Sequence, residues 1–234
     1  MGSRQTDNQS DNLAQFYLSR QGDERNLFQI WEGGGARGDS VTPSTYSIEY
    51  RTWMVEKLSG ELERHHAKGL LSLGCGNAMV EAELVRMGSR VVGIDAMHDA
   101  VELARAKGVE AVHADIGSWS PAEPWSLIYM DGVLGHLYDP ATGLRPILER
   151  IRSWLAAANG SGVATLIASN DVPKNEGPVE PAPGVNGFHW LAASYLRDQG
   201  LAAGFDHVEI EEFSYRRPVS GRRQRAIITA RVTG

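Results

Sequence analysis

The sequence predicts an α/β protein with a mostly parallel sheet, and two patterns carry this prediction. The first is the stretch from Gly69 to Asp95, which has the order strand, glycine turn, helix, strand and acid. Such a unit binds a nucleoside and places its ribose hydroxyls on the acid. The second is the alternation of five apolar runs with helical segments before a closing β hairpin. Strands that alternate with helices form a parallel sheet whose two faces are both covered.

The first unit shows how local residue types lead to this prediction. Leu70–Leu73 is a short, mostly apolar run of the kind that forms a buried parallel strand. Gly74 and Gly76 follow it, where a tight turn favours residues without a Cβ and a ligand can approach the backbone closely. Asn77 is the expected cap of the next helix, and a second apolar strand then ends on Asp95.

The residues before this unit divide into a polar tail and a helical lid. Residues 1–12 are polar and are expected to be disordered. Residues 13–65 are expected to form one or two short helices up to Trp31, a glycine-rich loop, and a longer helix from Thr42 to about His65. Residues 66–234 then form the main domain, because a chain of this length supports one α/β core with accessory elements.

The rest of the chain continues the alternation of strands and helices. The expected elements are a helix over Ala96–Lys107, strands over Glu110–His113 and Leu127–Met130, a helix within Ala141–Ala157, a strand over Val163–Ala168, a long loop over Asn170–Phe188, a helix over His189–Ala203, and strands over His207–Tyr215 and Arg225–Val232. Pro146 suits the first turn of its helix better than the interior. The final hairpin carries Arg216, Arg217, Arg222, Arg223 and Arg225. We interpret these arginines as a solvated turn rather than an RNA-binding patch.

Charge and cysteine content disfavour several functional classes. The formal net charge of -6 gives no support to a nucleic-acid partner, which would need a basic surface. Cys75 is the single cysteine, so no internal disulfide can form and nothing indicates an oxidising compartment. No apolar run approaches the roughly 20 residues that span a bilayer, and the N-terminus lacks a signal-peptide core. We therefore expect a cytoplasmic protein that binds no membrane.

Candidate ligand-binding residues follow each predicted strand, at the edge where parallel sheets bind ligands. They are Gly74 and Gly76 after the first strand, Asp95 after the second, Asp115 after the third, Asp131 after the fourth and Asn170 after the fifth. An acid after the second strand suits a ribose diol, which donates two hydroxyl hydrogens to a carboxylate. Asp115 is placed to meet an adenine amino group, with Ile116 and Trp119 as apolar cover. Each acid alone could cap the next helix, but their shared position favours a nucleoside site.

Four segments, LLSLGCGNA, VVGIDAM, HADI and IYMDGVLGHL, resemble in their order the motifs of class I S-adenosylmethionine-dependent methyltransferases. The resemblance covers Thr42 to Gly234. It implies a Rossmann-like, seven-stranded sheet with six parallel strands and one antiparallel strand, and S-adenosyl-L-methionine as the cofactor. By position it implies contacts of the glycines with the methionine part, of Asp95 with the ribose, and of Asp131 with the sulfonium. The full set implied is Gly74, Gly76, Asp95, Ala96, Met97, Asp115, Ile116, Asp131 and Gly132.

A second resemblance concerns the acceptor. The segments TYSIEYRTWMVEKL, DAMHDA and GVLGHLYD look like those of small-molecule N-methyltransferases of the glycine N-methyltransferase type, and of some antibiotic-tailoring N-methyltransferases. This resemblance implies that the N-terminal helices form a lid over cofactor and substrate. It places Trp31, Tyr46 and Arg51 near the charged methionine end of the cofactor.

Methyl transfer from a sulfonium is an in-line displacement in which positioning supplies much of the rate. We assign His136 and Tyr17 to catalysis, with His136 near the transfer point; a packed histidine is the alternative. The residues expected to contact the substrate are Tyr50, Tyr138, Asn170, His189 and Trp190. The tyrosines, Tyr46 included, could surround a cationic amine or simply pack the lid, and His189 and Trp190 could be no more than a helix start. Cys75 is expected to fill the turn rather than act as a nucleophile.

A metal-assisted reaction is the less favoured alternative. Asp131, Asn170 and Asp171 follow neighbouring strands and could hold Mg²⁺. The segment GVLGHL after Asp131 resembles the metal-free branch more, so we predict no metal.

These observations predict methyl transfer from S-adenosylmethionine to a small molecule, more readily to an amine nitrogen of a natural product or metabolite than to an oxygen. A small-molecule O-methyltransferase and a non-catalytic S-adenosylmethionine-binding module are the alternatives. A dehydrogenase ranks third, because Met79 stands where a dinucleotide fingerprint has its third glycine. The expected partner is the small substrate, and the sequence leaves a homo-oligomer open.

Overall fold

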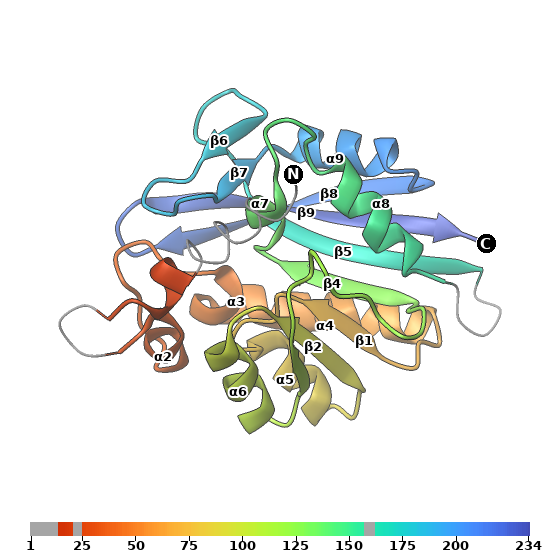
Figure 1. Cartoon of the computed structure of the whole chain (residues 1–234), viewed down its shortest axis with the longest axis horizontal. Helices are drawn as coiled ribbons and strands as arrows, with labels where there is room; N and C mark the ends of the chain where they lie inside the picture. The colour runs from red at the N-terminus through yellow and green to blue at the C-terminus, as the bar shows by residue number, and fades with distance from the viewer. Residues whose placement is uncertain (1–13, 21–24, 157–161) are drawn as a thin grey trace.

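The computed structural model describes residues 14–20, 25–156 and 162–234, and its centre is a seven-stranded sheet with the order β3-β2-β1-β4-β5-β9-β8 (Figure 1). The strands are β1 (Leu70–Leu73), β2 (Val91–Asp95), β3 (Glu110–His113), β4 (Leu127–Asp131), β5 (Val163–Asp171), β8 (His207–Arg217) and β9 (Gly221–Thr233). All five predicted strands and the closing hairpin are therefore confirmed. The polar tail predicted for residues 1–12 lies outside the described residues.

The direction of the strands also agrees with the expectation. Strands β1 to β5 pair in parallel, and β9 pairs antiparallel with both β5 and β8. Six strands therefore share one direction and β9 alone runs against them. Because the order proceeds outward from β1 to β2 on one side and to β4 on the other, the switch point lies between β1 and β4. Ligands bind at the carboxyl ends of the strands beside such a switch.

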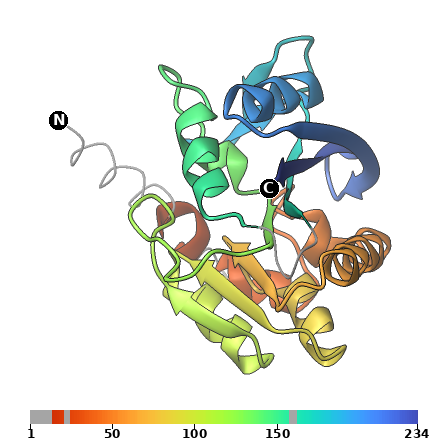
Figure 2. The ribbon, with the colours of Figure 1, turned by 90° about the vertical axis from the view of Figure 1, so that its right-hand side faces the viewer.

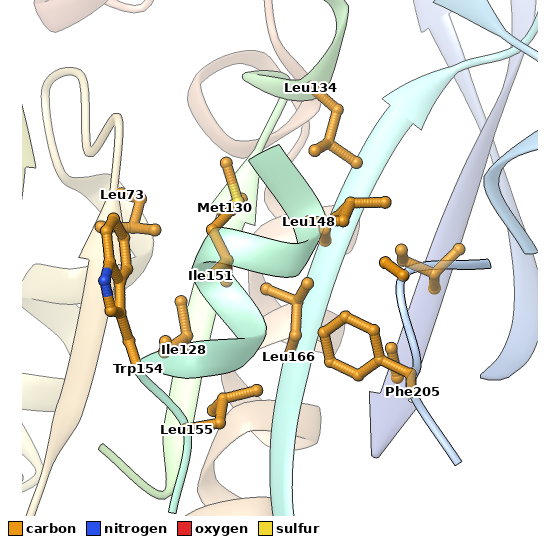
Figure 3. Close-up of a cluster of buried hydrophobic side chains, with 14 of the residues drawn as sticks. Leu73, Ile128, Met130, Leu134, Leu148, Ile151, Trp154, Leu155, Leu166 and Phe205 are labelled. Carbon is orange, nitrogen blue, oxygen red and sulfur yellow. The ribbon is translucent and has the colours of Figure 1, made fainter. Parts of the chain in front are cut away.

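Helices cover both faces of the sheet (Figures 1 and 2). The helices are α2 (Leu27–Glu32), α3 (Pro43–Tyr46), α4 (Ile48–Arg64), α5 (Met79–Arg86), α6 (His98–Ala106), α7 (Leu134–Leu137), α8 (Arg145–Ser153) and α9 (Ala193–Ala202). Side chains of α4, α5 and α6 share one buried cluster with Leu127 and Tyr129 of β4. Those of α8 and α9 share the other with Ile128 and Met130, as Figure 3 shows for α8. This alternation along β4 is the period of two that places a strand between two apolar layers.

The predicted helix from Thr42 to His65 is wrong in one respect, because it is two helices rather than one. Ser47 lies between α3 and α4 with an extended backbone (φ -107°, ψ 116°). Its hydroxyl accepts a hydrogen bond from the backbone N–H of Tyr50, so Ser47 is the N-cap of α4. Pro43 begins α3 as expected, and Pro146 lies in the first turn of α8 as expected.

The predicted helix that starts at His189 and the loop before it are also corrected. His189–Leu191 is strand β7, which pairs antiparallel with β6 (Val179–Pro181) inside the predicted loop, and the helix α9 begins only at Ala193. Strand β5 continues through Asp171, so Asn170 is a strand residue. Pairing between β6 and β7 satisfies backbone groups that a helix start at His189 would leave unpaired. Among the described residues, no helix has the length and apolar character that crossing a membrane requires.

Candidate active site

A cavity of about 200 Å³ opens at the carboxyl ends of β1, β2 and β4. It brings together most of the residues that the sequence singled out for cofactor binding: Trp31, Gly74, Gly76, Asp95, Ala96, Met97, Asp115, Ile116, Asp131 and Gly132. Tyr46 is the exception, because its side chain is 40% exposed on α3 and does not line the cavity. We call this space the first cavity.

The glycine turn after β1 forms the floor of the first cavity. Gly74 has φ +70°, and a Cβ at this position would meet the Val133 side chain at 2.4 Å, so only glycine fits. Gly76 has φ +53° and donates its backbone N–H to Asp95 Oδ2 at 2.8 Å. The predicted cap at Asn77 is wrong. Ala78 occupies the cap position of α5 in a left-handed conformation, and Asn77 Nδ2 instead donates to Glu32 at 3.2 Å.

Asp95 joins the turns that follow β1 and β2. Its Oδ1 accepts a hydrogen bond from the Met97 backbone N–H at 2.8 Å, while Oδ2 accepts from Gly76. The carboxylate is buried, and burial raises its pKa although the two N–H groups oppose that effect. Asp95 is therefore fixed at the rim of the cavity, where a diol can reach its remaining lone pairs.

The region after β3 only partly follows the sequence prediction. Asp115 Oδ1 accepts from the Gly117 backbone N–H at 2.8 Å, and Ile116 is buried against the cavity. Trp119, expected as apolar cover, instead packs edge-on against Trp154 at 5.9 Å. Phe28 and Trp31 of α2 instead line the cavity and supply apolar cover.

A second cavity of about 280 Å³ adjoins the first. The two cavities share Tyr17, Trp31, Thr42, Gly132 and His136 as lining residues. Aromatic side chains that line the second cavity are Phe16, Tyr17, Trp31, Phe188 and Trp190. The shared residues therefore form a junction between a space at the sheet edge and a second space lined by aromatic side chains.

The two side chains assigned to catalysis meet at this junction. Tyr17 Oη lies 2.8 Å from His136 Nε2, although the two residues are 119 positions apart in the chain. Burial, with a contribution from nearby His189, lowers the pKa of His136 to about 3. Burial and the charge of Asp95 raise the pKa of Tyr17. At neutral pH the pair therefore consists of an uncharged imidazole and an uncharged phenol.

Comparisons with known proteins decide the family. A family model described as a methyltransferase domain matches residues 70–158. The chain is 41% identical over 209 residues to the tabtoxin biosynthesis enzyme of Pseudomonas amygdali pv. tabaci, covering 88% of this chain and 81% of that protein. The trans-aconitate 2-methyltransferase of an Azoarcus strain is 34% identical over 106 residues, which are 44% of this chain and 42% of that enzyme.

Solved structures show the same fold. The 1,6-didemethyltoxoflavin-N1-methyltransferase of Burkholderia thailandensis superposes with a TM-score of 0.65 at 17% identity, covering 99% of this chain and 90% of that one. For the magnesium protoporphyrin IX methyltransferase of Synechocystis the TM-score is 0.61 at 15% identity, covering 95% and 96%. The chain belongs to the class I S-adenosylmethionine-dependent methyltransferases.

The floor of the second cavity in this methyltransferase is a buried ion-pair network that the sequence analysis missed. Arg225 on β9 is 1% exposed; its guanidinium binds Asp131, donates to Asp171 at 2.9 Å and donates to Ser169 at 3.1 Å. The Arg225 guanidinium therefore lies between the two acids that were considered as Mg²⁺ ligands. Its positive charge lowers the pKa of Asp131, against the effect of burial. The described part of the chain holds no group of three or more side chains suited to a metal ion.

The interpretation of the hairpin arginines as a solvated turn is wrong for three of the five. Arg223 and Arg225 are buried, and Arg217 binds Asp171 and donates to the Asp39 backbone carbonyl at 3.2 Å. The Asp39 carboxylate in turn accepts the backbone N–H groups of Val219 and Ser220, at 2.8 and 3.0 Å. The signal was present in the sequence, because residues 223, 225 and 227 share one face of a strand and the last is an isoleucine.

Most residues predicted to contact the substrate support the site from outside the two cavities. Tyr50 is fully buried and donates to Asp131 at 3.1 Å and to Ser169 at 3.2 Å. Asn170 is fully buried; it accepts from the Gly135 backbone N–H at 3.1 Å and donates to the His189 carbonyl at 3.0 Å. Tyr138 packs against the His189 ring at 4.7 Å, and neither lines a cavity.

Trp190 alone of this set lines the second cavity. The Arg223 guanidinium lies over its ring at 4.1 Å and the Lys174 ammonium lies 5.5 Å from its centroid. Burial raises the pKa of Cys75 well above the usual range for a thiol, so Cys75 remains protonated and fills the turn beside Gly93, as expected.

Proposed function

We propose that this methyltransferase binds S-adenosylmethionine in the first cavity and methylates an amine nitrogen of a small molecule held in the second cavity. The observation that carries this proposal is the junction itself, where Tyr17 and His136 line both spaces. In-line displacement needs the acceptor and the donor to approach through one opening along the C–S axis. Two adjoining cavities with a shared wall supply that arrangement.

The first cavity fits the cofactor by its residue types. Asp95 would accept the two ribose hydroxyls, as a fixed carboxylate with free lone pairs can. Met97 and Ile116 would border the adenine, and Gly74 and Gly76 would let the methionine part approach the backbone. Asp131 and Gly132 would lie beside the sulfonium. When bound, S-adenosylmethionine supplies a methyl group on a positively charged sulfur, an electrophile with a good leaving group.

The second cavity favours an amine over an alcohol or a phenol. Aromatic faces attract organic cations, and five aromatic side chains line this space. His136 has a pKa of about 3, so it is too weak a base to deprotonate an alcohol or a phenol. A neutral amine attacks without such a base, and its nitrogen becomes positively charged as the N–C bond forms and the C–S bond breaks, which the aromatic faces stabilise. The role proposed for His136 and Tyr17 is therefore to orient the acceptor at the opening.

The similarity of this chain to a natural-product enzyme extends the proposed class of acceptors to natural products. The relative with 41% identity is named a tabtoxin biosynthesis enzyme, and it matches along most of both chains. We therefore propose that the acceptor is an amine-bearing metabolite or an intermediate of antibiotic biosynthesis.

The deciding experiment is a mass-spectrometric screen with S-adenosylmethionine whose methyl group carries deuterium. Panels of amines, phenols and carboxylic acids of matched size are incubated with the protein, and each product is then treated with mild base. An N-methyl product keeps its label under base, whereas a methyl ester loses it. We expect labelled N-methyl products. Ester or ether products would replace the amine proposal with an O-methyltransferase, and cofactor binding without turnover on any panel would support a non-catalytic binding module.

A further inference from the structure

Glu81 is a buried acid in the first cavity with no role in the proposal above. Glu81 is the third residue of α5, is 4% exposed and lines the first cavity. The Ser72 hydroxyl donates to its Oε1 at 2.5 Å. The other hydrogen bond that acts on this carboxyl comes from the backbone N–H of Glu81 itself.

Glu81 also lacks a counter-charge within the described residues, where no Lys, Arg or His nitrogen lies within 4.0 Å of its carboxylate. The other buried acids of this cavity are better satisfied. Asp131 binds Arg225, and Asp95 accepts two backbone N–H groups. Removing a carboxylate from water without a cation is costly, and proteins usually avoid it. An acid that the fold buries and leaves without a cation, at the wall of a ligand cavity, indicates that the cation comes with the ligand.

The effects of burial and of nearby negative charges on the pKa of Glu81 outweigh those of its hydrogen bonds. Burial is the main cause that raises its pKa to about 7, and the charges of Asp131 and Asp95 add to the effect. The Ser72 hydroxyl opposes it. Tyr129 on β4 and the Cys75 thiol also line this part of the cavity, and burial raises the pKa of each, so both are uncharged. The two charges that act on Glu81, those of Asp131 and Asp95, are therefore both negative, and a cation beside Glu81 would offset them.

The position of Glu81 in the first cavity determines which part of the cofactor it would contact. Asp95, Met97 and Ile116 lie after β2 and β3, where the adenosine part is proposed to bind. Glu81 is joined to β1 through Ser72, and Asp131 at the end of β4 affects its pKa more than Asp95 does. An adenosyl group on the β2 side directs the amino-acid part of the cofactor toward the β1 and β4 side.

We propose that Glu81 is the counter-ion for the α-ammonium group of the cofactor, and that its ionisation sets how tightly the cofactor binds. This inference rests on the proposed binding of S-adenosylmethionine in the first cavity. A purely structural role, in which Glu81 only ties α5 to β1 through Ser72, is the competing explanation. The two differ because a structural link needs no charge and a counter-ion does.

The test compares two ligands by isothermal titration calorimetry. S-adenosylhomocysteine carries the α-ammonium group, whereas 5′-methylthioadenosine has the same adenosyl group and no amino-acid part. At pH 8 we expect Glu81→Gln to weaken S-adenosylhomocysteine binding by at least about tenfold, as the loss of one buried charge pair would, and to change 5′-methylthioadenosine binding by less than about twofold. Glu83→Gln, which changes a partly exposed acid of the same helix, is the matched control and should change neither.

A second measurement uses the wild-type protein alone, so it does not depend on whether a variant folds. Between pH 8 and pH 6 its preference for S-adenosylhomocysteine over 5′-methylthioadenosine should fall by about tenfold, because a group with a pKa near 7 takes up a proton over this interval. A preference that stays constant with pH would overturn the proposal, as would an equal loss of both ligands in Glu81→Gln. Wild-type protein that binds neither ligand would instead refute the proposed cofactor site.

Discussion

Arg225 and Asp171 stand opposite each other in the β5–β9 ladder, and Arg225 Nη1 donates to Asp171 Oδ1 at 2.9 Å. The pair connects the antiparallel strand β9 to its neighbour β5 within the seven-stranded sheet, and both residues line the second cavity. Because both side chains are almost completely buried, neither charge has water as an alternative partner. The network is therefore expected to matter for folding as well as for the shape of the site.

Replacing Arg225 tests this expectation. Arg225→Met leaves Asp131 and Asp171 buried without their shared cation, and removing one partner of a buried pair typically costs about 3–5 kcal/mol. We expect a loss of that size in the free energy of unfolding from urea titration. Arg222→Met is the matched control, because Arg222 is an exposed arginine of the same strand whose side chain donates only to Ser214, and it should cost less than about 0.5 kcal/mol. Equal losses in the two variants would contradict the assignment.

Gly135 allows a steric test of how closely α7 packs against Phe188 and His189 at the start of β7. A Cβ at this position would meet the His189 carbonyl oxygen at 2.3 Å and the Phe188 ring at 2.4 Å. Gly135→Ala should therefore displace β7, destabilise the fold by about 1–3 kcal/mol and raise KM for the acceptor, with little change in S-adenosylhomocysteine affinity. Gly60→Ala, in the interior of α4 with open space around the new methyl group, should instead stabilise by about 0.5–1 kcal/mol.

The Tyr17–His136 pair predicts an unusual pH profile. Because the pKa of His136 is about 3, its ring stays neutral from pH 5 to pH 9 and contributes no inflection to kcat/KM there. Tyr17→Phe removes the 2.8 Å contact and should lower kcat by roughly fivefold, the equivalent of one hydrogen bond of about 1 kcal/mol. An inflection near pH 6.5 that disappears in His136→Asn would show that His136 titrates in this range. The ionisation of an acceptor amine would persist in both proteins.

Glu81 predicts how the stability of the unliganded protein depends on pH. Its pKa is about 7 in the folded state against 4.5 in the unfolded chain, so the folded state binds the proton more tightly. Its contribution to stability is therefore complete below about pH 4.5 and is lost as the pH rises to 7. At 1.36 kcal/mol per pKa unit, Glu81→Gln should gain about 2–3 kcal/mol relative to the wild type between pH 5 and pH 8 in guanidinium titrations. Glu83→Gln should show no such change, and a gain of the same size in that variant would contradict the prediction.

Local patterns in the sequence predicted the sheet and the first cavity well. Residue type and spacing alone were enough to place Gly74 and Asp95. Gly74 lies in a turn that needs φ +70°, and Asp95 ends a buried strand. The alternation of strands and helices likewise predicted the parallel strands and the closing hairpin, and the resemblance to class I methyltransferases implied the seven-stranded sheet with one antiparallel strand. These features depend on neighbours within about 20 residues of each other.

Features that depend on distant pairing were predicted poorly. Alternation along its strand could indicate that Arg225 is buried, but its ion-pair partner follows from its register against Asp171, 54 residues earlier, which no local pattern reports. Tyr50 was predicted to contact the substrate as one of several tyrosines near the site, but it is fully buried and its hydroxyl donates to Asp131. For the segment His189–Leu191, the choice between helix and strand was decided by the presence of β6 as a pairing partner.

The hydrogen bonds from Val219 and Ser220 to Asp39 span 180 and 181 residues of chain. Contacts between residues so far apart in the chain form slowly, because closing a long loop first costs entropy. The second cavity, which is lined by Asp39, Arg217 and Arg225, is therefore complete only after the β8–β9 hairpin has paired and met Asp39. Until then its aromatic residues lack their cover, and apolar surface exposed in an incompletely folded protein favours aggregation.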